Sequence, residues 1–233
     1  MDNTTKTTTR IKAVYNALDD LQDKVVFVGG AVVALYADRV VLDPRPTDDI
    51  DVIVEMLNYR DHAALEQKLH QKGFVNDQDS GIACRYKVQG ITVDIMPTTD
   101  RSFGFDSLWY EPGFEKAIAI ALDDKHTIRI LSAPYYLATK LEAFRDRGHG
   151  DGRTSQDFED IVFILNNRSS IWSEIDQADT EVRSYIFSEF TQLLSEPHLE
   201  EWIYSHADRS NQIATSFIIM HIEALVGKNA VRK

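Results

Sequence analysis

The chain has 233 residues, of which 43% are hydrophobic and 10% aromatic, so it can bury the core of one large domain or two small ones. Its net charge of −12 argues against broad, sequence-independent binding to a nucleic acid backbone, although a local basic cleft is compatible with it. No apolar run approaches the roughly 18 residues of a membrane span, the N-terminal stretch lacks the apolar core of a secretory signal, and Cys84 is the only cysteine. A cytoplasmic protein without an internal disulfide is therefore expected.

The first part of the chain mixes helical and strand patterns. Apolar periodicity predicts helices over residues 11–22, 31–38 and 59–72, and strands over 24–28, 49–55, 82–88, 91–96 and 126–131. Gly73 is expected to cap the third helix, and Gln89-Gly90 to form a hairpin turn. Pro44 and Pro46 place a loop over residues 39–47.

The second part of the chain is helical in pattern. Helices are expected over residues 133–147, 155–167, about 171–195 and about 197–226, with a glycine-rich loop over 148–154. We therefore expect an α+β protein in which residues 1–131 form an α/β domain with a mixed sheet and flanking helices. Residues 132–233 are expected to form a helical domain that completes a nucleotide cleft.

Carboxylates gather at the start of one predicted strand. Asp48, Asp49 and Asp51 open the strand "DIDVIV", and Asp94 lies in the strand "ITVDIMP". Asp49 and Asp51 are two residues apart and share a face, whereas Asp48 points to the other face of a regular strand. If the two strands pair, three carboxylates converge, and such a set can hold two divalent cations. Mg²⁺ or Mn²⁺ delivered with a nucleotide would then supply the missing positive charge.

A glycine pair precedes these carboxylates in the sequence. Gly29 and Gly30 stand between a predicted strand and a predicted helix, where absent side chains let a triphosphate approach the backbone. Alone, such a pair is usually a turn, and a single Asp-x-Asp is usually a solvated strand start. The ordered combination of strand, Gly-Gly, helix, Asp-x-Asp strand and a third strand aspartate favours a nucleotidyltransferase site.

The sequence at this point resembles the nucleotidyltransferase superfamily that includes DNA polymerase beta, and more closely the AbiEii toxins of type IV toxin–antitoxin systems. The gap between Gly30 and Asp49 is longer than in the compact form of the motif, and the loop over 39–47 is expected to take up the surplus. The resemblance runs from about residue 25 to 167 and is carried by "FVGGAVVALY", "RPTDDIDVIVE", "GITVDIMP", "SAPYYLATKLEAFRDRG" and "DFEDIVFIL".

The resemblance implies transfer of a nucleoside monophosphate from a nucleoside triphosphate to an acceptor, for which the 3′ end of transfer RNA is expected, and a cognate antitoxin as partner. The resemblance implies that Gly29 and Gly30 bind the triphosphate. It also implies that the catalytic carboxylates Asp49, Asp51 and Asp94 bind the metal. Lys140 and Arg147 would bind the nucleotide, and Asp157 would be a further catalytic carboxylate.

The residues leave alternatives open for the helical segment. Lys140 and Arg147 share a helix face with Phe144, which suits a triphosphate and a base, but neighbouring acids on that helix are equally able to pair with them. Ser155 is expected to cap the next helix, so Asp157 also fits a dipole-stabilising position, and Asp160 lies nearer the core. Two rival functions also remain: a nucleotide- or protein-binding module without turnover, and nucleotidylation of a small molecule or a protein.

Three further side chains have simpler interpretations. Arg85 and Asp94 are expected to form an ion pair across the hairpin, and contact of Arg85 with phosphate is the alternative. Cys84 has no histidine nearby in the sequence and is interpreted as a buried structural thiol. His149 lies in the glycine-rich loop, and a role in the cleft is its less favoured interpretation.

Overall fold

The computed structural model describes residues 2–39, 44–55, 59–98, 107–148, 150–207 and 212–232. They divide into two compact units. Unit one holds the described residues up to Leu35 and from Arg45 to Ser132, and unit two holds those from Tyr36 to Pro44 and from Ala133 onward. Part of the predicted loop over 39–47, namely residues 40–43, and His149 lie outside the described residues.

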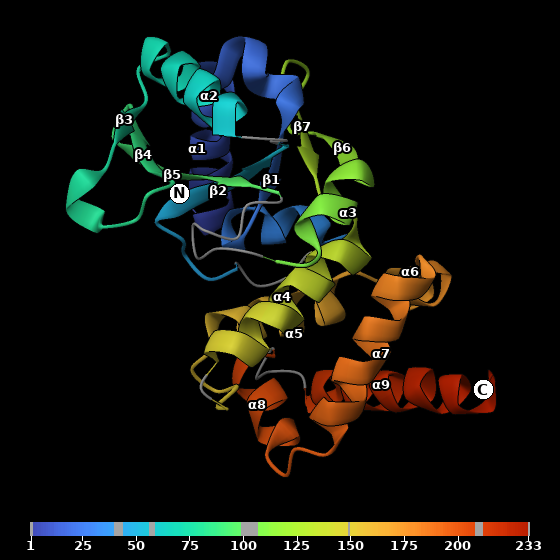
Figure 1. Cartoon of the computed structure of the whole chain (residues 1–233). Helices are drawn as coiled ribbons and strands as arrows, with labels where there is room; N and C mark the ends of the chain where they lie inside the picture. Colours follow the sequence, from blue (N-terminus) through green and yellow to red (C-terminus); the bar gives the residue numbers. More distant parts are fainter. Residues whose placement is uncertain are drawn as a thin grey trace. The chain divides into compact units, whose positions relative to one another are not determined.

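Unit one is built on a seven-stranded mixed sheet in the order β3-β4-β5-β2-β1-β7-β6 (Figure 1). At its centre, β2 runs antiparallel to β1 and parallel to β5, and β1 runs parallel to β7. This sheet, together with the flanking helices, confirms the predicted α+β class. The strands are β1 (Val25–Val28), β2 (Asp49–Val54), β3 (Val75–Asn76), β4 (Arg85–Val88), β5 (Ile91–Pro97), β6 (Ile118–Ala121) and β7 (Thr127–Ile130).

The central strands are buried because their sequences are nearly all apolar. All four residues of β1 are buried, as are the last three residues of β2. Helix α1 (Asn3–Leu18) packs against β2 and β5 and buries Ile11, Val14 and Leu18, which recur at helical spacing. The strands that carry the aspartates, β2 and β5, are thus packed on α1.

The start of the chain differs from the prediction of a helix over 11–22. Helix α1 begins at Asn3, because the carboxylate of Asp2 accepts a hydrogen bond from the backbone N–H of Thr5 at 2.6 Å. It ends at Leu18, and a 3₁₀ helix over Asp19–Lys24 follows. After the glycine pair the chain also forms a 3₁₀ helix, Gly30–Tyr36, rather than the predicted α-helix.

Several local features of unit one follow the prediction. Helix α2 (Tyr59–Gln71) is followed by Gly73 with φ 86°, the left-handed conformation of a C-terminal cap. Gln89 and Gly90 have φ 50° and 77° and join β4 to β5 in a tight hairpin. Strand β4 begins only at Arg85, three residues later than predicted.

Four short elements of unit one were not predicted, and one of them is the 3₁₀ helix Gln78–Ser80. Strands β3 and β6 form the two edges of the sheet, and α3 (Tyr110–Glu115) lies just before β6. Strand β3 has only two residues, too few for a periodic signal, whereas the uninterrupted apolar run of β6 was visible in the sequence and was missed.

Unit two is a set of packed helices (Figure 1). Helix α4 packs against α5, α6 and α7, which explains why most of its residues are buried. The predicted helices over 133–147 and 155–167 are confirmed, and the hydroxyl of Ser155 accepts a hydrogen bond from the N–H of Phe158. The helices are α4 (Ala133–Arg147), α5 (Gln156–Asn167), α6 (Ile171–Gln177), α7 (Thr180–Leu194), α8 (Leu199–His206) and α9 (Gln212–Arg232).

The two long predicted helices of this unit are each divided. Ala178 and Asp179 are extended, with ψ 162° and 144°, and this separates α6 from α7. Ala207 is extended in the same way and ends α8. No helix among the described residues is long and apolar enough to cross a membrane.

Candidate active site

Three carboxylates meet on one face of the sheet in unit one. The register places Asp51 of β2 beside Asp94 of β5, and Asp49 stands two residues before Asp51 on the same face. One ligand oxygen from each of Asp49, Asp51 and Asp94 lies within 4.8 Å of the other two. Asp94 is 4% exposed, and the other two are half-buried. The predicted convergence of the three aspartates is therefore present, although it depended on β5 pairing with β2.

Arg85 adjoins this set from the next strand. It lies opposite Asp94 in the β4–β5 ladder, and its Nε and Nη2 donate to the two oxygens of Asp94 at 2.8 and 2.7 Å. The same Nη2 lies 3.4 Å from Oδ2 of Asp49. The predicted ion pair is confirmed, and its hydrogen bonds with Asp94 raise the pKa of Arg85 further, so that the guanidinium keeps its charge.

Gly29 is placed tightly against one of the carboxylates. Its φ of 71° is one that residues with a side chain rarely adopt, and a Cβ at this position would overlap the carboxylate of Asp51. Strand β1 brings the two together because Val28 pairs with Asp51 across the β1–β2 ladder. The absent side chain at Gly29 thus makes room for Asp51.

Two arginines that the sequence analysis did not single out lie beside these elements. A Cβ on Gly30 would overlap the guanidinium of Arg45, which precedes β2. Arg10 of α1 donates to the backbone carbonyls of Thr47, at 2.6 Å, and of Asp48. The motif "RPTDDID" contained the signal for Arg45, whereas Arg10 lies in a polar helix with nothing nearby to mark it.

Asp48 and Cys84 behave as their interpretations expected. Asp48 is exposed and is not one of the three converging carboxylates. Cys84 is 3% exposed, and burial together with nearby Asp94 raises the pKa of its thiol to about 11. The thiol is therefore protonated and structural at neutral pH.

The charged residues predicted from the helical segment come together within unit two. Nζ of Lys140 lies 3.1 Å from Oδ1 of Asp157 and 2.6 Å from Oδ2 of Asp160. Arg147 donates from Nε and Nη2 to both oxygens of Asp157 at 2.8 and 3.1 Å. Lys140 and both aspartates are buried, whereas the Arg147 side chain is 62% exposed.

The electrostatics of Asp157 follow from these contacts. Burial alone would raise the pKa of this carboxyl, but the hydrogen bonds of Arg147 and the charges of Lys140 and Arg147 outweigh it and hold the pKa below its usual range. Asp157 is thus ionised at neutral pH and held between two cations. That Lys140, Arg147 and Asp157 contact the nucleotide stays a prediction.

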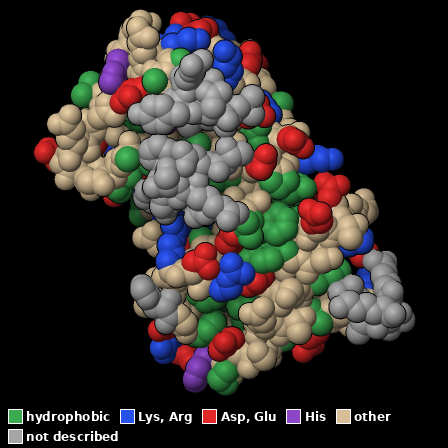
Figure 2. Space-filling model, in the orientation of Figure 1, with side chains coloured by type: hydrophobic (Ala, Val, Ile, Leu, Met, Phe, Trp, Pro, Cys, Tyr) green, Lys and Arg blue, Asp and Glu red, His purple; other side chains and the backbone are tan. Residues whose placement is uncertain are grey.

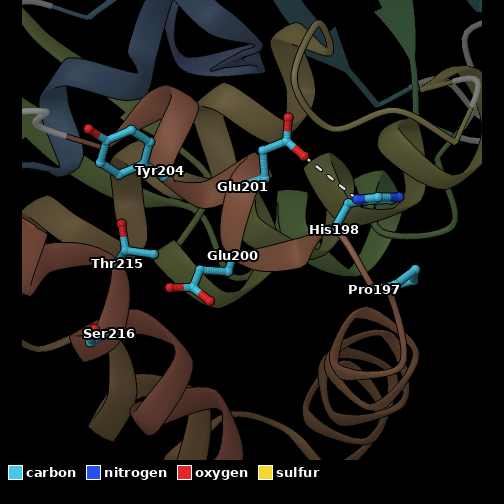
Figure 3. Close-up of a pocket in the computed structure, with 7 residues that line it drawn as sticks. All are labelled: Pro197, His198, Glu200, Glu201, Tyr204, Thr215 and Ser216. Atoms are coloured by element: carbon cyan, nitrogen blue, oxygen red, sulfur yellow. Dashed lines mark ion pairs between the residues drawn. The ribbon is translucent and has the colours of Figure 1, made fainter.

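Unit two also contains a hollow (Figure 3). It has a volume of about 570 Å³, and Glu201 on its wall pairs with His198 at 3.6 Å and with Arg153 at 3.2 Å. None of its lining residues is a predicted site residue, and the convergent carboxylates remain the better candidate for catalysis. It is lined by Pro197, His198, Glu200, Glu201, Tyr204, Thr215 and Ser216.

Comparisons with known proteins find a matching family and a similar solved structure. A family model described as "Nucleotidyl transferase AbiEii toxin, Type IV TA system" matches residues 12–209. Among solved structures, an antigenic nucleotidyltransferase-like protein from Paracoccidioides brasiliensis is similar, at 16% identity and a TM-score of 0.49, covering 85% of this chain and 92% of that one. No curated protein matches the chain.

Replacing Gly29 by alanine should cost far more stability than the same change at Gly73. Both residues have positive φ, so each alanine meets left-handed strain of roughly 1–2 kcal/mol. Only at Gly29 must Asp51 also move, because nothing lies within 4 Å of a Cβ at Gly73. Urea unfolding should show a loss of about 3 kcal/mol or more for Gly29→Ala. Equal losses for the two variants would contradict the close packing of Asp51 on Gly29.

Asp157→Asn should destabilise the protein at neutral pH and have little effect in acid. Because the folded-state pKa of Asp157 is lowered, its stabilisation is full above the unfolded value, about 4, and is lost as the pH falls through the folded value. At pH 7 the cost should be about 3 kcal/mol, since a buried ionic set loses a partner.

The measurement is the free energy of unfolding of the wild type and the variant at pH 7 and below pH 3. Asp146→Asn is the control, because Asp146 is 61% exposed and pairs with Arg145 at the surface, and it should have almost no effect. A cost of Asp157→Asn that is the same at both pH values would mean that packing, not charge, is responsible.

Proposed function

The chain belongs to the AbiEii family of nucleotidyltransferase toxins, and from this we propose that it transfers a nucleoside monophosphate from a nucleoside triphosphate to an acceptor hydroxyl, releasing pyrophosphate. The observation that carries the proposal is the alignment of Asp51 with Asp94 in the β2–β5 ladder, with Asp49 on the same face. In the transfer, the acceptor oxygen forms a bond to the α-phosphorus, the bond from that phosphorus to the bridging oxygen breaks, and the hydroxyl proton is lost to solvent or to a carboxylate.

The ligand set of this site suits a hard divalent cation. Three carboxylates offer oxygen atoms, which Mg²⁺ and Mn²⁺ prefer, and their spacing within 4.8 Å leaves room for shared ligands. Such a cation, held by Asp49, Asp51 and Asp94, would neutralise phosphate charge and favour ionisation of the acceptor hydroxyl.

The remaining predicted residues are assigned to the nucleotide. The backbone at Gly29 and Gly30 is proposed to face the triphosphate, and Arg45, whose guanidinium lies against Gly30, adds a positive charge there. Lys140 and Arg147 are proposed to contact the nucleotide, with Asp157 as a further catalytic carboxylate, on the basis of the family. Their mutual ion pairs hold the three side chains in fixed positions.

Transfer RNA, at its 3′ end, is the acceptor proposed from the resemblance to the AbiEii toxins. A cognate antitoxin is the proposed partner, because the family model describes a type IV toxin–antitoxin system. The charge of −12 limits how such an RNA could bind. Figure 2 shows acidic and basic side chains of the described residues mixed on the face in view rather than gathered in one basic surface. The proposed recognition is therefore local, at the RNA end, and not spread along its backbone.

Transfer should disappear when Asp49 and Asp51 are both replaced by alanine. The purified protein is incubated with total RNA, Mg²⁺ and each labelled nucleoside triphosphate in turn. The double variant should lose about a thousandfold in rate or more, because about 4 kcal/mol of transition-state stabilisation goes with the cation. Asp48→Ala is the matched control, since Asp48 is adjacent but outside the convergent set, and it should keep near-normal activity.

The distribution of label decides the acceptor. Label in a discrete band at the size of transfer RNA, with one nucleotide, supports the proposed acceptor and identifies the donor. Label on protein, or on neither macromolecule while pyrophosphate is released, assigns the acceptor to a protein or a small molecule. Full activity of the double variant contradicts the site.

A further inference from the structure

Arg85 places a positive charge next to the carboxylates that are proposed to bind metal, where a metal site does not require one. Its planar fork binds both oxygens of Asp94, and the same Nη2 reaches toward Asp49. Asp94 is 4% exposed, so its charge is costly without a partner. Arg85 therefore brings one positive charge to Asp94 and Asp49 together.

The same contacts place Arg85 in competition with a divalent cation. A cation at Asp94 must use an oxygen that already accepts a hydrogen bond from the guanidinium, and it must approach a positive charge within a few ångströms. Asp49 is less affected, since its contact with Arg85 is 3.4 Å and its side chain is 37% exposed. Arg85 therefore competes with a cation mainly at Asp94.

We propose that Arg85 is an internal counter-cation that controls metal loading, so that a divalent cation occupies the Asp94 side of the site only when Arg85 gives up part of its pairing with that carboxylate. This inference rests on the proposed function, because it assumes that the carboxylates bind metal. In this scheme Arg85 acts on metal loading through its pairing with Asp94, and it contacts the substrate only when a triphosphate is bound.

A bound triphosphate would give Arg85 a second anionic partner when a cation takes its place at Asp94. The Arg85 side chain is 22% exposed, and its guanidinium matches phosphate oxygens as well as it matches a carboxylate. The negative charge of the triphosphate would offset the repulsion between Arg85 and the divalent cation. Loading of a cation on the Asp94 side would then depend on the nucleotide.

The chain provides a matched control two residues away. Lys87 lies on the same face of β4 as Arg85, but it pairs with Asp77 at 3.0 Å and is 54% exposed. Lys87→Gln and Arg85→Gln each remove one positive charge from the same strand. Any difference between them in metal affinity therefore reports on contact with the carboxylates and not on net charge.

The test is Mn²⁺ binding to the full chain without nucleotide, measured by titration calorimetry and by electron paramagnetic resonance. Arg85→Gln should tighten Mn²⁺ binding by about tenfold or more, because removing a cation next to the site is worth at least one decade of affinity. Arg85→Lys keeps a charge but loses the fork and should bind with intermediate affinity, and Lys87→Gln should bind as the wild type does.

Thermal unfolding adds a second readout. Arg85→Gln should lower the melting temperature without metal, and Mn²⁺ should restore more of it than it adds to the wild type. If the ion pair were merely structural, the melting temperature would fall with no gain in affinity, and this result would overturn the inference. Should Arg85→Gln not fold, Arg85→Lys decides: tighter binding than the wild type supports the inference, and equal or weaker binding overturns it.

The Asp49→Ala/Asp51→Ala variant separates this inference from the proposed function. If the variant loses Mn²⁺ binding while Arg85→Gln binds no more tightly than the wild type, the metal centre stands and the role of Arg85 is wrong. If the variant binds Mn²⁺ as the wild type does, the carboxylates are not the metal site, and the proposed centre and the inference fail together.

Discussion

Repulsion among three carboxylates on one face of the sheet is the constraint on which the rest of unit one depends. The parallel pairing of β2 with β5 sets Asp51 beside Asp94, and no rotation of these side chains takes both away from that face. The sheet accommodates them by placing Arg85 opposite Asp94 and a glycine without a side chain beside Asp51. Three carboxylates held this close together make the site attractive to a cation.

The charged set in unit two is balanced differently. Asp157 and Asp160 meet Lys140 and Arg147, so that two carboxylates face two cations. Lys140, Asp157 and Asp160 are more deeply buried than Asp49 and Asp51, and burial of ions is tolerated only where charge and hydrogen bonds are matched. The acidic set of the sheet is therefore suited to bind an added cation, whereas the set in the helices is suited to hold its members in place.

Local sequence predicted the parts of the site that local structure determines. The pairing of Arg85 with Asp94 followed from the hairpin, because the positive φ of Gln89 and Gly90 fixes the register of the strands on either side. The convergence of Asp51 and Asp94 was conditional, since it required two strands far apart in the chain to be neighbours. The two-residue strand β3 and the break at Ala178 depend on tertiary packing, which apolar periodicity does not record.

The glycine pair shows why the motif functions as one unit although its halves are far apart in sequence. A glycine after a buried strand suggests approach by a ligand, yet the atoms nearest to the missing Cβ of Gly29 belong to Asp51. The β1–β2 ladder pairs Val28 with Asp51, so the ladder, not the connection, sets the distance between them. Extra residues between Gly30 and Asp49 therefore lengthen only the connection, whose entropic cost grows slowly with length. A longer gap than in the compact motif is compatible with the same arrangement of glycine and carboxylate.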